Sequence, residues 1–423
     1  MYAQLIVSFA KKNIGIILLS LIFLLHIFLR FYQLEYRFQF GYDQIDSAWA
    51  AKRILIDHNY PLAGPANKLG SGIFVGPLYY YIISIFYFFT NMDPIAGAYF
   101  AGVTSIITFF AILLIVKRLF SFYVGLIAIC INTISLTGIE FDRIQWEPNF
   151  IPAVSLLVFY SLYKIITKNE KYILLLAIAL GASFHVHLTA AFFLSVITLP
   201  TLPFFPKNKN MLKCMVFSAP LFILWLMPII VASTQKELSL ASNSVAYANS
   251  SIHGLHLTRV LQLFPDAFYQ FFSFIPFSPI SFLRYLFIPL FILIYFLNKP
   301  SRKGFLLCYL VVLWFIAPWF FLSLYSGEIS NYYYTVNRPI ALMIIAFIVY
   351  QFLTLRKKII TLALIIFTLY YSYNTLSKFF AYRPVGLHNY RVLVKDAVAK
   401  GKKIEFVEGK PEWYLYYIYT RKK

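Results

Sequence analysis

Long apolar runs alternate with short polar junctions along most of the chain. A helix that crosses the hydrocarbon core of a bilayer needs about 20 predominantly apolar residues. By this rule the pattern predicts an all-α polytopic membrane protein with about eleven transmembrane helices. They cover residues 14–29, 95–116, 121–138, 150–166, 172–185, 189–205, 214–232, 280–297, 305–325, 339–355 and 359–373.

Two segments decide this count. Residues 172–205 form one apolar stretch, which as a single helix at 1.5 Å per residue is about 50 Å long, too long for one crossing. The polar run from His185 to Thr189 therefore predicts a tight external turn inside it. Residues 77–89 are apolar but short, with three consecutive tyrosines near their start. We expect them to form a helix that lies in the outer interface or dips into it without crossing.

Positive charge collects at every second junction. Lys and Arg are retained on the cytoplasmic side of membrane proteins, so the pattern predicts the N-terminus inside and the C-terminus outside. Glu170 is then the only acid on the inner side. The first apolar run lacks a small-residue cleavage pattern and is expected to remain as an anchor. The basic clusters lie at residues 11–12, 117–118, 164–171, 207–213, 299–303 and 356–358.

Composition agrees with this class. Of the 423 residues, 61% are hydrophobic and only 13% are charged, which excludes a soluble globular protein. The formal net charge of +21 is spread over short inner loops and the tail. It therefore indicates membrane topology and contact with lipid headgroups, and no nucleic-acid partner is expected.

The predicted spans divide the chain into two parts. A transmembrane domain covers residues 1–376, and its external loops are 30–92, 139–149, 233–279 and 326–338. A small external C-terminal module follows at 377–423. Its pattern predicts an α/β tail, with a helix near 389–399 and strands at 403–407 and 413–419. A module of this size has little core of its own, so we expect it to pack on the external loops.

Candidate chemistry begins in the first external loop. Asp43 and Asp46 are followed by Lys52 and Arg53 on a segment with a helical pattern from Ser47. A carboxylate there can deprotonate an acceptor hydroxyl, and the cations can hold an anionic leaving group. The structural alternative is a solvated loop in which Asp46 caps the helix and the cations snorkel.

The second external loop is unusually rich in charge. It carries Glu140, Asp142, Arg143 and Glu147 between two predicted spans, where charge is costly and tends to be functional. Glu147 immediately precedes Pro148, so its carboxylate can also favour the positive end of the next helix. Asp142 and Arg143 are candidates for substrate contact, or they pair with each other.

Histidines, tyrosines and one late arginine complete the candidates. His185 and His187 lie on the predicted turn at 185–189, as a metal pair or as hydrogen-bonded turn residues. Tyr79, Tyr80 and Tyr333 are candidate substrate contacts. Residues 332–334 with Asn337 and Arg338 can form an interfacial belt. Alternatively, Arg338, which opens a span from outside, can hold a lipid phosphate. No nucleotide-binding pattern stands in a suitable context, so no nucleotide cofactor is expected.

Several motifs occur in a familiar order. These are Asp43, Gly76-Pro77-Leu78-Tyr79-Tyr80-Tyr81, Lys117-Arg118-Leu119-Phe120 and Trp146-Glu147-Pro148-Asn149-Phe150-Ile151-Pro152. Together they resemble the GT-C membrane glycosyltransferases, in the branch of the protein O-mannosyltransferases and the aminoarabinose transferase of lipid A. The resemblance covers residues 42–189 and implies a GT-C fold.

The resemblance also implies an activity. A sugar would move from a polyprenyl-phosphate carrier to a glycolipid, polysaccharide or protein acceptor, at the outer face of a bacterial or archaeal cytoplasmic membrane. Asp43 falls at the presumed base and Glu147 at a second acid, where relatives carry Asp or Asn. Val75 and Gly76 stand where some relatives have an acidic and a basic residue. The metal and phosphate contacts that the resemblance would otherwise imply at this position are therefore not expected here.

Direct displacement at the anomeric carbon would invert its configuration. The leaving phosphate would be held by Lys52, Arg53 and Arg338. Whether a divalent metal takes part remains open, and its candidate ligands are Asp43, Glu147 and His187. The substrate-contact candidates are Asp46, Tyr79, Tyr80, Asp142, Arg143, His185, His187 and Tyr333.

Two other classes stay open at this point. A flippase of lipid-linked glycans predicts functional charges near the bilayer midplane and interrupted helices in an inverted repeat. An O-antigen polymerase or ligase would rely on Arg and His of a long late loop, here His253, His256 and Arg259.

Overall fold

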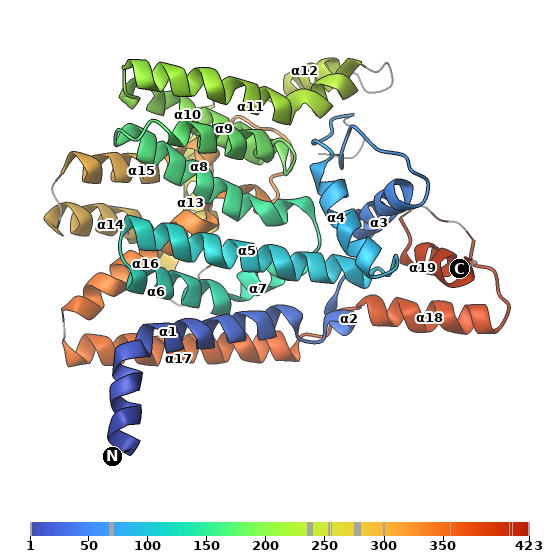
Figure 1. The fold of residues 1–423 in the computed structure, drawn as a ribbon, viewed down its shortest axis with the longest axis horizontal. Helices are drawn as coiled ribbons and strands as arrows, with labels where there is room; N and C mark the ends of the chain where they lie inside the picture. The colour runs from blue at the N-terminus through green and yellow to red at the C-terminus, as the bar shows by residue number, and fades with distance from the viewer. Residues whose placement is uncertain are drawn as a thin grey trace.

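A bundle of apolar helices forms the body of the molecule (Figure 1). The structure is a computed structural model that describes residues 2–66, 72–234, 240–252, 254, 256–274, 281–298, 301–355, 357–405, 407 and 409–421. Among these residues, seven helices are long and apolar enough to cross a membrane. They are α1 (Tyr2–Phe31), α5 (Ile95–Leu119), α8 (Ile151–Ile166) with η1 (Glu147–Phe150), α11 (Lys209–Thr234), α15 (Arg302–Ser323), α16 (Arg338–Thr354) with η5 (Asn331–Asn337), and α17 (Lys358–Ala381).

The other four predicted spans are also apolar helices, but broken or short. The run at 121–138 is α6 (Phe122–Ile134) and α7 (Leu136–Arg143), which meet at a bend of 71°. The stretch at 172–205 breaks as predicted, because α9 (Tyr172–Ser183) ends before the histidines and α10 (Leu188–Thr198) with η2 (Leu199–Phe204) begins after them. The run at 280–297 is α14 (Arg284–Asn298). The count of eleven crossings stays a prediction for these shorter helices.

Helix α16 lies at the centre of the bundle. Every residue from Arg338 to Ile348 is buried, because other helices surround it. Polar contacts add to the packing on one side, where Trp314 Nε1 donates to Ser155 Oγ at 2.9 Å and Ser155 Oγ donates to the carbonyl of Val336 at 2.6 Å. Hydrogen bonds of this kind between helices help hold a bundle together in lipid.

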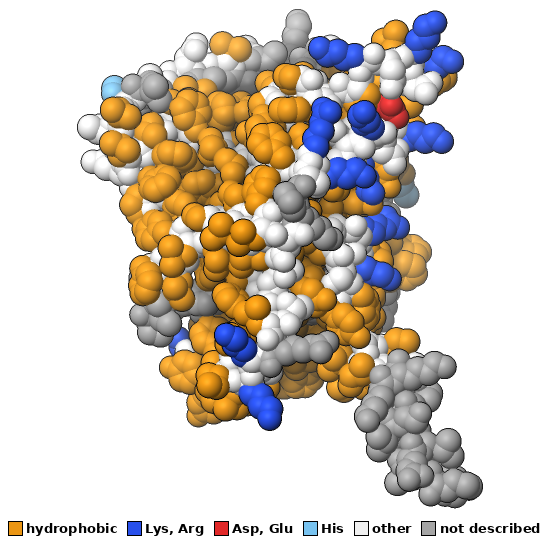
Figure 2. Space-filling model, turned by 90° about the vertical axis from the view of Figure 1, so that its left-hand side faces the viewer, with side chains coloured by type: hydrophobic (Ala, Val, Ile, Leu, Met, Phe, Trp, Pro, Cys, Tyr) orange, Lys and Arg blue, Asp and Glu red, His pale blue; other side chains and the backbone are white. Residues whose placement is uncertain are grey.

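The two ends of the bundle differ in charge. Figure 2 views the end on the left of Figure 1, where α5 finishes with Lys117 and Arg118. Lys and Arg side chains are scattered over this end with very little acid, and broad apolar surface lies beside them. The sequence predicts that this end faces the cytoplasm.

Short helices gather at the opposite end. They share one cluster of buried residues that includes Phe38, Tyr87, Leu387 and Tyr414. In Figure 1, α4 runs across the direction of α5, as expected for a helix that does not cross the membrane. The helices are α2 (Leu34–Arg37), α3 (Tyr42–Leu55) and α4 (Leu78–Phe89) of the first loop, and α18 (Leu387–Ala399) and α19 (Pro411–Thr420) of the tail.

The predicted α/β tail is wrong in its strands. Residues 413–419 lie within α19, and the described part of 403–407 contains no strand. Aromatic and β-branched residues favour strands locally, but here Tyr414 and Leu415 pack together on the first-loop helices, which a helical turn allows. Arg391 of α18 also pairs with Glu35 at 3.0 Å and with Asp93. The tail therefore packs on the external loops, as predicted.

The long late loop contains two further helices. They are α12 (Leu240–Ser251) and α13 (Leu257–Phe271). The amphipathic α13 packs its apolar face on α15, where the rings of Phe268 and Phe315 lie 4.2 Å apart.

Candidate active site

Helix α3 begins earlier than the sequence pattern indicated. Gly41 precedes its first turn, and its backbone N–H donates to Gln44 Oε1 at 3.0 Å. Asp46 therefore lies within the helix, and its predicted role as the N-cap is wrong. Asp43 stands in the first turn, where the positive end of the helix dipole favours a negative charge.

Buried hydrogen bonds attach α3 to the second external loop. Gln44 Nε2 donates to the backbone carbonyl of Gln145 at 2.7 Å. The hydroxyl of Tyr79 joins the two segments as well, since it accepts from Ser47 Oγ at 3.2 Å and from Gln145 Nε2. These contacts hold the turn that carries Glu147 beside the start of α3.

A cavity of about 510 Å³ opens at this junction, and we call it the acid cavity. It brings together five of the predicted residues, Asp43, Asp46, Arg53, Tyr80 and Glu147. Tyr80 lies in the wall and donates a hydrogen bond to Asp46. The remaining described wall residues are Tyr42, Ser47, Asn59, Pro61, Ala63, Gly64, Pro65, Ala66, Phe74, Trp146, Pro148 and Tyr332.

Asp43 shares the acid cavity with two other carboxylates, Asp46 and Glu147. Burial raises the pKa of Asp43, and the nearby charge of Asp46 raises it further. A carboxylate whose pKa is raised is a stronger proton acceptor once ionised, which suits a general base.

The predicted cations separate in the structure. Arg53 lines the acid cavity and also a neighbouring cavity of about 340 Å³ against the C-terminal tail, which we call the tail cavity. Lys52 lines only the tail cavity, where its Nζ pairs with Asp57 at 2.7 Å.

Asp142 lies in a buried ion cluster away from these cavities. It pairs with Arg30 at 2.9 Å and with Arg338 at 2.6 Å, and the three side chains are at most 4% exposed. Arg338 also donates to Asn132 Oδ1. The predicted position of Arg338 at a carrier phosphate is therefore wrong, because its donors are directed at Asp142 and Asn132 inside the protein.

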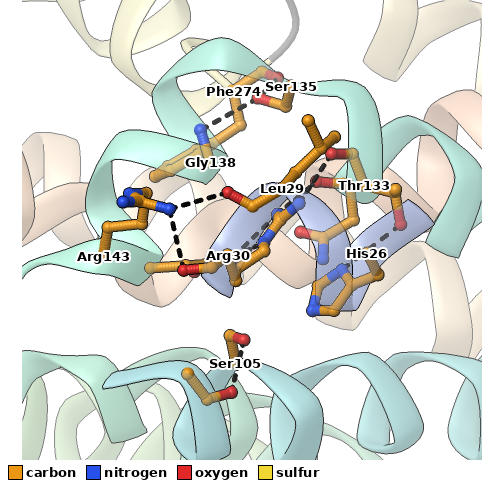
Figure 3. A network of polar contacts seen from close by, with 12 residues as sticks. His26, Leu29, Arg30, Ser105, Thr133, Ser135, Gly138, Arg143 and Phe274 are labelled. Atoms are coloured by element: carbon orange, nitrogen blue, oxygen red, sulfur yellow. Dashed lines mark hydrogen bonds and ion pairs between the residues drawn. The ribbon is translucent and has the colours of Figure 1, made fainter. Parts of the chain in front are cut away.

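Arg143 does not pair with Asp142, contrary to one prediction. Its guanidinium donates instead to the backbone carbonyls of Leu29 and Arg30, as Figure 3 shows, and to that of Tyr32. These carbonyls lie at the end of α1, where a helix leaves its last C=O groups without partners. Arg143 therefore attaches the end of α7 to the end of α1.

The two histidines of the 185–189 turn have structural partners. His185 Nε2 donates to the carbonyl of Trp225 at 2.6 Å, and its Nδ1 accepts from the N–H of Leu78. A Cβ at Gly76 would lie 2.1 Å from this ring, so glycine is needed there. His187 Nδ1 accepts from the N–H of Thr189 at the start of α10.

The ring of His187 packs on Tyr332 and Tyr333. Of these two tyrosines, only Tyr332 is among the described wall residues of the acid cavity. In the part of the chain that the structure describes, no three His, Cys, Asp or Glu side chains are grouped as metal ligands. The candidate set of Asp43, Glu147 and His187 does not form such a group.

Sequence reasoning missed several residues of this region. Gln44 and Gln145, which join the two loops, carry no local signal. The sequence pattern assigns Arg30 to the first external loop, but its side chain is buried and pairs with Asp142. A charged residue at the end of an apolar run is itself a sign of such a buried partner. Trp146 and Tyr332 of the cavity wall also make an edge-to-face contact, with ring centroids 5.3 Å apart.

No protein-family model matches the chain, and no curated protein matches it. Three-dimensional similarity is clear. ArnT from Cupriavidus metallidurans, solved with undecaprenyl phosphate, is similar with a TM-score of 0.55 and 11% identity over 95% of this chain and 68% of that one. The Archaeoglobus fulgidus oligosaccharyltransferase, solved with Zn and sulfate, gives a TM-score of 0.58 and 13% identity over 94% of this chain and 57% of that one.

A further structure of the archaeal enzyme, AglB from Archaeoglobus fulgidus, contains an inhibitory peptide and a dolichol-phosphate. It matches with a TM-score of 0.54 and 13% identity over 96% of this chain and 60% of that one. This chain thus spans between about half and two thirds of these enzymes. Both are GT-C glycosyltransferases. The chain therefore has the GT-C fold, and it is a multi-pass membrane protein.

Proposed function

We propose that this protein is a membrane glycosyltransferase that moves a sugar from a polyprenyl-phosphate carrier to a hydroxyl of an acceptor. The observation that carries the proposal is the acid cavity, where Asp43, Glu147 and Arg53 meet from two external loops. The fold supports it, because similar enzymes were solved with undecaprenyl phosphate and with a dolichol-phosphate.

The chemistry follows from the residues of the cavity. Asp43 takes the proton of the acceptor hydroxyl, whose oxygen then forms a bond to the anomeric carbon. The bond between that carbon and the phosphate oxygen breaks, and the prenyl phosphate leaves with the electron pair. Arg53 holds the developing negative charge. Glu147 orients the acceptor, and the displacement inverts the anomeric centre.

The proposed active site lies at the end of the bundle away from the Lys- and Arg-rich face of Figure 2. With the orientation inferred from basic residues, this end faces the outside of a bacterial or archaeal cytoplasmic membrane. Of the three cations suggested for the carrier phosphate, Arg53 keeps that role. Lys52 is paired with Asp57, and Arg338 with Asp142.

The described residues favour this class over the two others. The buried charges Arg30, Asp142 and Arg338 stand at helix ends, as the last or first turns of α1, α7 and α16, whereas a flippase predicts charges at the midplane. In the late loop, Arg259 donates to the carbonyl of Tyr325, His256 directly precedes α13, and His253 lies outside the described residues.

A transfer assay tests the proposal. The purified full-length protein is incubated with a panel of prenyl-phosphate sugars and candidate acceptors, with and without divalent metal, and free prenyl phosphate is measured. We expect release from at least one donor, with inverted configuration in the product. Absence of release from every donor would argue against a transferase.

The pH dependence of transfer should report on Asp43. A base works only when ionised, so activity falls as pH drops through the pKa of Asp43, which burial raises and the charge of Asp46 raises further. Asp46→Asn removes that negative charge, and the acidic limb of the kcat/KM profile should move to lower pH. Asp396→Asn, which removes an exposed carboxylate on α18 and leaves the three cavity carboxylates in place, serves as the comparison. An acidic limb that stays in place in Asp46→Asn would contradict the assignment of Asp43.

A further inference from the structure

The tail cavity has a wall from each end of the chain. Helix α3 supplies Trp49, Lys52 and Arg53, and the C-terminal module supplies Lys410 and Trp413. The contact between the two walls is close at Gly409, whose φ is +72° and whose Cβ, if present, would lie 2.6 Å from the Tyr42 ring. Glycine suits this backbone conformation, and it places Lys410 beside α3.

From this cavity we infer that the C-terminal module helps to select the acceptor, and that the tail cavity binds an acidic sugar residue of it. The inference rests on the proposed function. It concerns a subsite distinct from the acid cavity where transfer would occur.

The charge of the cavity favours an anion. Its described wall carries three cations, Lys52, Arg53 and Lys410, against two acids, Asp46 and Asp57. A concave surface with excess positive charge concentrates anionic ligands, and guanidinium and ammonium groups bind carboxylates and phosphates through charge-assisted hydrogen bonds.

The aromatic residues favour a sugar. Trp49 and Trp413 have ring centroids 4.6 Å apart, and Trp413 is stacked on Tyr417 with an interplanar angle of 14°. The faces of aromatic rings carry partial negative charge and attract the slightly positive C–H groups on one side of a pyranose. Binding sites of this size typically combine such apolar walls with a few polar groups that fix orientation.

The position points to the acceptor rather than the donor. The tail cavity and the acid cavity share Tyr42, Asp46 and Arg53 in their walls, so a sugar in the first can present a hydroxyl to the second. A prenyl-linked donor must keep its chain in the lipid. The tail cavity is lined instead by α3 and the C-terminal module, whose short helices lie together at one end of the bundle (Figure 1).

Binding without any donor tests this inference. Saturation-transfer NMR titrations on the full-length protein in detergent would compare methyl β-glucuronide and glucose 6-phosphate with neutral methyl β-glucoside. We expect at least one acidic sugar to bind about 5-fold or more tightly than the glucoside. Lys410→Gln should lower that preference about 5-fold. This factor corresponds to the loss of one partly exposed ion pair, which contributes about 1 kcal/mol. Lys402→Gln, an exposed change in the same module, should not alter it.

The outcomes separate this inference from the proposed function. Three results would each overturn the acidic-sugar site. They are equal binding of acidic and neutral sugars, an unchanged preference in Lys410→Gln, and full competition by inorganic phosphate at the same concentration. If prenyl phosphate is released and any of these results is found, the proposed transferase function is supported and only the acidic-sugar site is rejected. Lys410-dependent binding of an acidic sugar without release from any donor supports the site and contradicts the transferase.

Discussion

Asp43→Asn is expected to lower the rate of sugar transfer by about 10²- to 10⁴-fold, the usual contribution of a general base. The amide keeps the shape of the side chain but cannot take the proton of the acceptor hydroxyl. Because Asp43 is in the first turn of α3 and lines the acid cavity, the substitution leaves the attachment of α3 through Gln44 and Ser47 intact. The measurement is initial-rate release of prenyl phosphate by purified variants.

The matched control is Asp396→Asn, which changes an exposed acid on α18 that pairs with Lys400. It should retain the parent rate. Binding of the donor by Asp43→Asn should also persist, since Arg53 is unchanged. Transfer by Asp43→Asn at the parent rate would contradict the mechanism.

Asp142→Ala is expected to reduce stability by about 3–5 kcal/mol, the usual effect of removing one partner from a buried ion pair. The side chains of Arg30 and Arg338 are at most 1% exposed, and both would lose their only anion in the cluster. The measurement is the temperature at which the monomer peak disappears in detergent size-exclusion chromatography after heating.

Glu140→Ala provides the control, because Glu140 lies on the same short helix but is exposed. We expect its thermal midpoint to match that of the parent. Transfer should decrease in Asp142→Ala as well, since α7 leads directly into the turn that carries Glu147. Equal midpoints for the two variants would show that the cluster does not stabilise the fold.

These two expectations concern different uses of charge at one end of a membrane protein. Around Asp142, a carboxylate shared by two arginines joins α1, α7 and α16 inside the protein. Around Asp43, carboxylates gather at a cavity, with Arg53 nearby. The first arrangement holds the outer ends of three helices in place, and the second leaves charge accessible for chemistry.

The sequence alone determined the class of the protein and the candidates for its chemistry, whereas the GT-C fold was an expectation from a family resemblance that the structural comparison confirmed. A bilayer requires each crossing segment to be apolar over its own length, so apolar runs can be recognised one at a time. The break at His185, the short helix at 77–89 and the loop acids Asp43 and Glu147 were all visible in this way, because each depends on a few neighbouring residues.

Only the tertiary structure decided which of these residues meet. Asp142 is paired with Arg30 and Arg338, which are 112 and 196 positions away in the chain, and not with the adjacent Arg143. The segment at 413–419 has the composition of a strand, yet it is a helix because its buried residues pack on the first-loop helices. Such outcomes depend on the burial and hydrogen bonding that distant segments provide, and no local pattern contains that information.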